Sequence, residues 1–185
     1  MAIAPQLLSS MLATSFENLR WLLEDVDDED CFWEPADPCW SVRRREDAGR
    51  AWGTGEWVCE DAFPPPDPLP LTTIAWRLAH LAAWTDVYRS FAFDEDRLDL
   101  ALFDVPGTRD GLVAWLTAAQ DRLRAKVDAL DDTQLAERRP AYFGPPRPLH
   151  ALISTMVVEH THHGAEIGLL RDLRRGHARL RPPPL

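Results

Sequence analysis

The chain has 185 residues, 45% hydrophobic and 27% charged, a composition typical of one globular domain that can bury its own core. It contains no run of eighteen apolar residues, so we expect no membrane span. The formal net charge of −10 argues against binding to a phosphate backbone, so we expect no nucleic-acid partner.

The N-terminal stretch and the cysteines both indicate a cytoplasmic protein. The stretch MAIAPQLLSSML has no basic segment followed by an apolar one, and so does not resemble a signal peptide. The chain has three cysteines, which cannot all pair with one another, and none has CxxC spacing. We expect reduced thiols and assign no function to Cys31, Cys39 and Cys59.

The first predicted element is a helix over residues 5–25. Apolar residues recur there at helical spacing, which is typical of an amphipathic helix with one buried face. Six acidic residues crowd positions 24–30, where the dipole of the helix disfavours anions. The helix is therefore expected to stop near residue 25.

Residues 31–70 are predicted to form a long loop between the first and second helices. Pro35, Pro38 and the run PPPDPLP (64–70) interrupt any regular element. A structureless loop of this length is uncommon in a compact domain. The loop also carries several large aromatic residues, so we expect it to pack back on the body; these residues are Phe32, Trp33, Trp40, Trp52, Trp57 and Phe63. We favour core packing for its tryptophans; the alternative is that they line a substrate pocket shaped by this loop and the 131–148 connection.

The second predicted helix covers residues 71–93, with Thr72 or Thr73 as its N-cap. Its apolar residues lie on two stripes, which indicates burial on two sides. His80 falls among large hydrophobic residues, where an unpaired polar ring is costly. We therefore expect His80 to have a polar partner.

Two further helices are predicted, from about Thr108 to Leu130 and from about Pro148 to Arg174, with Gly176 as the stop. A proline-interrupted connection over residues 131–148 joins them. Four long helices without a convincing strand pair predict an all-α, four-helix bundle in one domain spanning residues 1–185. Since the 31–70 link is long enough to cross the bundle, an up-down-up-down order is not required.

The stretch EHTHHGAEI (159–167) of the last helix gathers one glutamate and three histidines within five positions. At about 100° per residue, His160 and His163 lie near the centre of the buried stripe and Glu159 lies at its edge. His162 points largely away. The spacing allows two metal-binding pairs, His160 with His163 and Glu159 with His163.

A metal site in a helical bundle needs an inward side chain from a facing helix, and His80 is the other histidine on a core-facing stripe. The resulting set is His80, Glu159 and His163. Two imidazoles and one carboxylate suit a divalent metal ion, with zinc, nickel and iron(II) as candidates. The alternative is that both histidines are core residues, bonded to each other or to Glu159. The HExxH, GxSxG, P-loop and GxGxxG motifs are absent from the sequence.

TTIAWRLAHLAAW (72–84) and EHTHHGAEIGLLRDL (159–173) resemble the DinB-like superfamily, and FWEP (32–35) and CWSV (39–42) resemble its actinobacterial branch. The resemblance implies an up-down-down-up four-helix bundle with a long crossover, commonly a homodimer. It also implies a metal held by one histidine of the second helix and two residues of the last. Glu159 and His163 are similar to the ExxxH pattern of mycothiol-dependent maleylpyruvate isomerase, and His80 matches the remaining ligand.

The resemblance implies a metal-dependent enzyme with a small-molecule substrate, using a low-molecular-weight thiol such as mycothiol in S-transfer or isomerisation. Zinc is the first choice of metal, with nickel or iron(II) as alternatives. His160 is the candidate catalytic proton donor, or else supports the ligands, and Glu166 belongs to the surface or to that supporting set. The other functions considered are hydrolysis at the same metal site and a stress-related, dimeric binding protein without catalysis.

Overall fold

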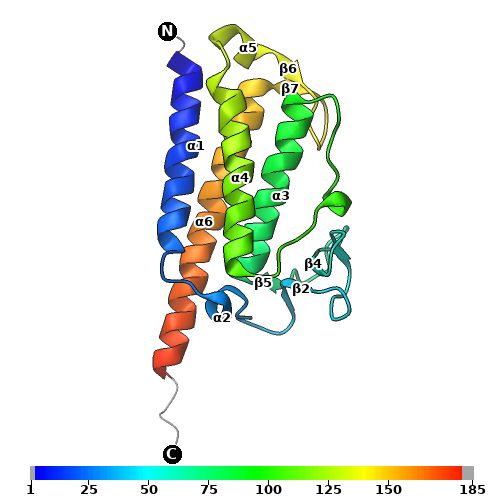
Figure 1. Ribbon diagram of the computed structural model, residues 1–185, viewed down its shortest axis with the longest axis vertical. Helices are drawn as coiled ribbons and strands as arrows, with labels where there is room; N and C mark the ends of the chain where they lie inside the picture. Colours follow the sequence, from blue (N-terminus) through cyan, green and yellow to red (C-terminus); the bar gives the residue numbers. More distant parts are fainter. Residues whose placement is uncertain (1–2, 181–185) are drawn as a thin grey trace, which may run out of the picture.

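The computed structural model describes residues 3–180, with side chains to residue 176, and is mostly helical (Figure 1). Between the long helices lie two short α-helices, α2 (Asp28–Cys31) and α5 (Asp132–Ala136), and a 3-10 helix, η1 (Leu100–Leu102). The four long helices are α1 (Ile3–Leu22), α3 (Ile74–Phe93), α4 (Arg109–Asp128) and α6 (Leu149–Leu180). No helix within residues 3–180 is long and apolar enough to cross a membrane.

The four long helices pack side by side, with α3 against α4 and α6, and α1 against α6 and α4. In Figure 1, α1 and α6 run downward while α3 and α4 run upward, which is the up-down-down-up order. The crossover is residues 94–108, which carry η1 and return along the helices from the end of α3 to the start of α4. The 31–70 link does not cross, because α1 ends and α3 begins at the same end of the molecule.

Local contacts explain where α3 begins and why α6 extends beyond its predicted end. The side chain of Thr73 accepts a hydrogen bond from the backbone N–H of Trp76, which makes Thr73 the N-cap of α3. α6 continues past Gly176, because one glycine costs a helix only about 1 kcal/mol. The ion pairs of Arg174 with Glu29 and Asp30 hold this part of α6 against the segment that follows α1.

The expectation of a strictly all-α fold is wrong, because the connections contain small sheets. β2 (Val42–Arg44), β4 (Trp57–Glu60) and β3 (Ala51–Trp52) form an antiparallel sheet in that order. β1 (Cys39–Trp40) pairs in parallel with β5 (Leu71–Thr72), and β6 (Arg138–Arg139) pairs with β7 (Arg147–Pro148). The proline run 64–70 lies between β4 and β5, so the prolines interrupt the connection and not the strands.

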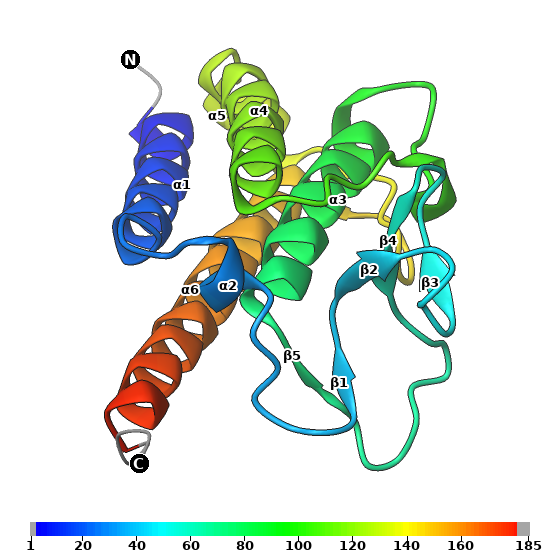
Figure 2. The same cartoon turned by 60° about the horizontal axis from the view of Figure 1, so that its bottom comes forward.

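The segment between α1 and α3 packs back on the helices, as the aromatic residues predicted. Figure 2 shows its short strands gathered beside the end of α3 at which that helix begins. Phe32, Trp40, Trp52 and Trp57 pack against the buried cluster formed there by α1, α3 and α4. Phe63 is the exception, with 80% of its surface exposed. This layer packs against the first turns of α3 and so holds in position the helix that carries His80.

Candidate metal centre

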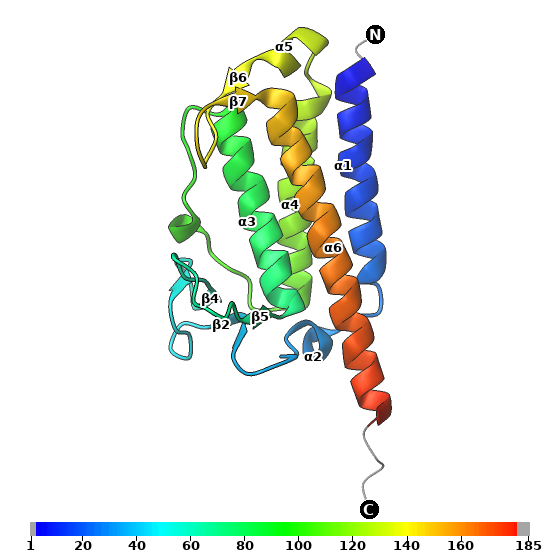
Figure 3. The same cartoon turned by 180° about the vertical axis from the view of Figure 1, so that it is seen from behind.

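His80, Glu159 and His163 come together where α3 packs against α6 (Figure 3). Glu159 Oε2 lies 3.3 Å from His163 Nε2 and 3.7 Å from His80 Nε2. Ligand atoms of the three residues all lie within 4.8 Å of one another. The structure thus brings together the three side chains that the sequence predicted as metal ligands.

Neighbouring aromatic rings hold the His80 imidazole in place. Its ring stacks on Trp76 with centroids 4.8 Å apart, and the tilted ring of Trp84 lies 6.1 Å away. Both tryptophans are one helical turn from His80, so the helical spacing of α3 brings them next to its ring. The side chain of His80 remains 21% exposed and that of Glu159 35%, which leaves the cluster open to small molecules.

A second carboxylate, that of Glu166, contacts the Nδ1 side of the His163 ring. Glu166 Oε2 lies 2.6 Å from His163 Nδ1 and 2.9 Å from a guanidinium nitrogen of Arg77. In the tautomer whose Nδ1–H donates to Glu166, the lone pair of His163 Nε2 is directed towards Glu159 and His80, and this is the form that a bound cation requires. Histidines that bind metals usually donate their other N–H to a carboxylate in this way. Glu166 therefore supports the cluster, one of the two positions that the sequence allowed for it.

The protonation states of the cluster suit metal binding. Hydrogen bonds with His163 and then His80 hold the pKa of Glu159 well below its usual range. Burial lowers the pKa of His80, although its hydrogen bond to Glu159 opposes this effect. Near neutral pH, Glu159 is thus ionised and His80 is neutral, which are the forms that bind a cation.

His162 points away from His80, as the helical spacing predicted. Its side chain is 64% exposed, and its Nε2 lies 3.2 Å from Glu166 Oε1. His162, His163 and Glu166 form a second set of three groups close enough to share an ion. This set lies on α6 alone and includes the exposed His162, whereas the first set combines less exposed side chains of α3 and α6, so we favour the first set.

His160, the predicted catalytic residue, lies inside the protein. Its surface is fully buried, and its Nε2 is 2.8 Å from the amide nitrogen of Gln120 and 3.3 Å from the hydroxyl of Thr85. Burial lowers the pKa of His160 to about 4. Its ring lies 6.5 Å from that of Phe16 of α1. His160 of α6 therefore contacts residues of α1, α3 and α4 in the core. A catalytic role for His160 stays a prediction, and this position does not favour direct contact with a substrate.

The fold and the cluster define a class of protein: four long helices with a candidate metal site between two of them. The family model of the DinB superfamily matches residues 11–167, so the chain belongs to that superfamily. A crystal structure of a conserved protein from Enterococcus faecalis has a similar fold, with a TM-score of 0.61 and 15% sequence identity. The match covers 95% of this chain and 99% of the other. No curated protein matches the chain with significant similarity.

Proposed function

We propose that this protein is a metal-dependent enzyme and that His80, Glu159 and His163 hold its divalent ion, with zinc as the first choice and nickel or iron(II) as alternatives. The proposal rests on the convergence of two imidazole nitrogens and one carboxylate oxygen within 4.8 Å. These groups come from two helices far apart in the sequence. Two imidazoles and a carboxylate are a ligand set of catalytic zinc sites, which keep a further position for water or substrate.

The ion, when bound, lowers the pKa of a thiol or water that joins the three protein ligands. The protein's own groups set the geometry and the access. Glu166 fixes the ring orientation of His163, and Trp76 and Trp84 hold the ring of His80. The partial exposure of Glu159 gives a small molecule a route to the cluster.

We further propose that the reaction uses a low-molecular-weight thiol such as mycothiol, in S-transfer or in thiol-assisted isomerisation of a small electrophile. The support is the ExxxH pattern of Glu159 and His163, which is similar to that of the mycothiol-dependent isomerase in the same superfamily. Turnover of an electrophile that requires added thiol would support this chemistry. Hydrolysis that proceeds equally well without thiol would contradict it.

The metal site is tested by the zinc content of purified protein, in the wild type and in single variants. Near-stoichiometric zinc should be lost in His80→Ala, Glu159→Gln and His163→Ala, but kept in the control His162→Ala. Loss in His162→Ala with retention in His80→Ala would place the ion in the second set of ligands. A wild type that holds no zinc or nickel after dialysis against either ion would make the proposed function wrong.

The homodimer that the resemblance implies is also a proposal. It is supported by an apolar stripe on the outer face of α1, where Ile3, Leu7 and Met11 are 73%, 60% and 44% exposed. Residues four apart lie on one face of a helix, so the three side chains form a continuous surface. A Leu7→Glu variant that changes from dimer to monomer in sedimentation would support this interface, and a monomeric wild type would contradict it.

A further inference from the structure

Arg147, at the start of β7, carries a positive charge without a carboxylate partner. Its side chain is exposed, and its Nη1 donates a hydrogen bond to the Thr155 hydroxyl at 3.4 Å. Within the described residues it forms no ion pair. By contrast, Arg77 pairs with Glu166 and Arg122 pairs with Asp86. Most N–H donors of Arg147 are therefore available to a ligand.

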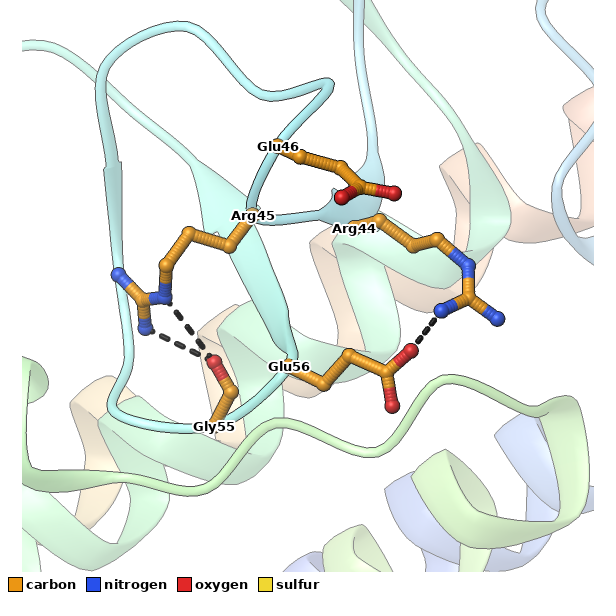
Figure 4. Close-up of a pocket in the computed structure, with 5 residues that line it drawn as sticks. All are labelled: Arg44, Arg45, Glu46, Gly55 and Glu56. Atoms are coloured by element: carbon orange, nitrogen blue, oxygen red, sulfur yellow. Dashed lines mark hydrogen bonds and ion pairs between the residues drawn. The ribbon is translucent and has the colours of Figure 1, made fainter.

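A hollow elsewhere in the protein is lined by arginines whose N–H donors already have partners. It lies at the β2–β4 hairpin (Figure 4), where Arg45 donates to the carbonyl oxygen of Gly55 at 3.0 and 3.1 Å and Arg44 pairs with Glu56. These guanidinium groups use their donors within the hairpin. Arg44 and Arg45 thus already have partners, and Arg147 is the stronger candidate for binding an anion.

Arg147 contacts the stretch of α6 that precedes Glu159. Thr155, which it contacts, precedes Glu159 by one turn of α6, or about 6 Å along the helix axis. Tyr88 of α3 lies within electrostatic range of both charges. Burial raises the pKa of Tyr88, Glu159 raises it further, and Arg147 opposes the rise. The phenol of Tyr88 is therefore influenced by the charges of both Glu159 and Arg147.

A wall of aromatic side chains extends from His80 along α3 to Tyr88. The ring of Trp84 lies 6.1 Å from that of His80 and 5.8 Å from that of Tyr88. The connection between β6 and β7 adds Tyr142 and Phe143, whose rings lie 4.8 and 5.5 Å from Trp84. Figure 3 shows this connection beside α3, and the chain then continues into Arg147. A flat apolar group would find aromatic contacts along the wall.

The charges of the site favour an anion once a metal ion is bound. Glu159 and Glu166 carry the negative charges, and Arg77 and Arg147 balance them. A divalent cation at His80, Glu159 and His163 would therefore leave the site positive, on a chain whose formal net charge is −10. A local positive field of this kind attracts an anionic ligand and orients it.

We propose that Arg147 binds the carboxylate of a small substrate whose flat apolar body lies along Trp84 and Tyr88 and whose reacting end reaches the metal centre. This assignment rests on the proposed function and adds the substrate class. Arg147 is suited to the role because a guanidinium binds a carboxylate through two parallel hydrogen bonds. Arg147 is thus a specificity-determining residue and not a metal ligand.

The test compares two probes that differ in one charge, 4-mercaptobenzoate and 4-mercaptobenzamide. In each, the ring separates a metal-binding thiol from the second group by about the length of one helical turn, ~6 Å. Zinc-loaded wild type should bind the carboxylate roughly 10–100-fold more tightly than the amide, the range for hydrogen bonds to charged groups. Arg147→Met should lose this preference while keeping its zinc. Arg20→Met, an exposed arginine on α1, is the matched control and should keep the preference.

An Arg147→Met protein that holds zinc and still prefers the carboxylate by the wild-type factor would overturn the assignment. If the wild type holds no zinc, the proposed function fails separately. Benzoate and benzamide are then compared on the metal-free wild type and on Arg147→Met. A preference for benzoate that disappears in the variant would support an anion site at Arg147, and equal binding by the two proteins would overturn it.

Discussion

Replacing Glu166 with glutamine tests whether His163 binds a metal ion through Nε2. The substitution keeps the size of the side chain and an oxygen that can accept the Nδ1–H of His163, but it removes the negative charge. In the native protein, Glu166 Oε2 receives this N–H at 2.6 Å and the Arg77 guanidinium at 2.9 Å. The variant should therefore leave Arg77 without its carboxylate and make His163 a weaker metal ligand.

The size of the effect follows from the position of Glu166. Loss of such a supporting carboxylate typically weakens metal binding by about 10–100-fold, or ~1.4–2.7 kcal/mol. The Glu166 side chain is 31% exposed, so water screens part of its charge. We therefore expect the lower half of that range, with the three ligands themselves intact.

Zinc affinity is measured by competition with a chelator at fixed pH, in the wild type, in Glu166→Gln and in the control Asp172→Asn. Asp172 also lies on α6 and pairs with Arg171, but its side chain is 65% exposed. Equal zinc affinity in all three proteins would refute the role of Glu166. Complete loss of zinc in both Glu166→Gln and His162→Ala would instead make Glu166 a direct ligand.

Two further predictions concern the folded core. The Asp86 side chain is 4% exposed and accepts hydrogen bonds from Arg122 at 2.5 and 3.0 Å. Asp86→Ala should therefore lower the free energy of unfolding in urea by about 2–3 kcal/mol. This is less than the ~3–5 kcal/mol lost when a fully buried pair is broken, because Arg122 is 46% exposed. Asp172→Ala, the exposed control, should cost less than about 1 kcal/mol, and equal losses in the two variants would contradict the argument. Burial raises the pKa of Cys31 to about 12 and that of Cys39 to about 11, above the ordinary value of 9.0. Both thiols therefore stabilise the folded state below about pH 9, and this contribution is lost as the pH rises through their pKa values in the folded protein. At pH 8 they should react with a disulfide reagent far more slowly in the native protein than in denaturant, and equally fast reaction in both would refute the burial argument.

The sequence determined the long helices, since each has enough turns for apolar spacing to appear in the residues themselves. It also determined that Glu159 and His163 share one face of α6, because that depends on helical geometry alone. The need of His80 for a polar partner could be stated from its apolar neighbours. The structure supplies Glu159 as that partner, 3.7 Å away.

The short strands and the choice of the connection that crosses the bundle could not be predicted from residue spacing, because both depend on contacts between distant segments. Strands of two to four residues are too short to show an alternating pattern, and each exists through a partner elsewhere, as β1 does through β5. The crossover over residues 94–108 follows from the parallel packing of α3 and α4. Sequence spacing does not specify which helices pack together.

The surroundings of the metal centre were likewise decided by tertiary structure. Arg77 reaches Glu166 and His163 because α3 packs against α6, and residues 77 and 166 carry no local signal of this contact. The hairpin of β6 and β7 returns the chain to the start of α6 beside α3, and this brings Arg147 into contact with Thr155. Helical periodicity fixes which side chains share a face, whereas only the packing of the helices fixes which faces meet.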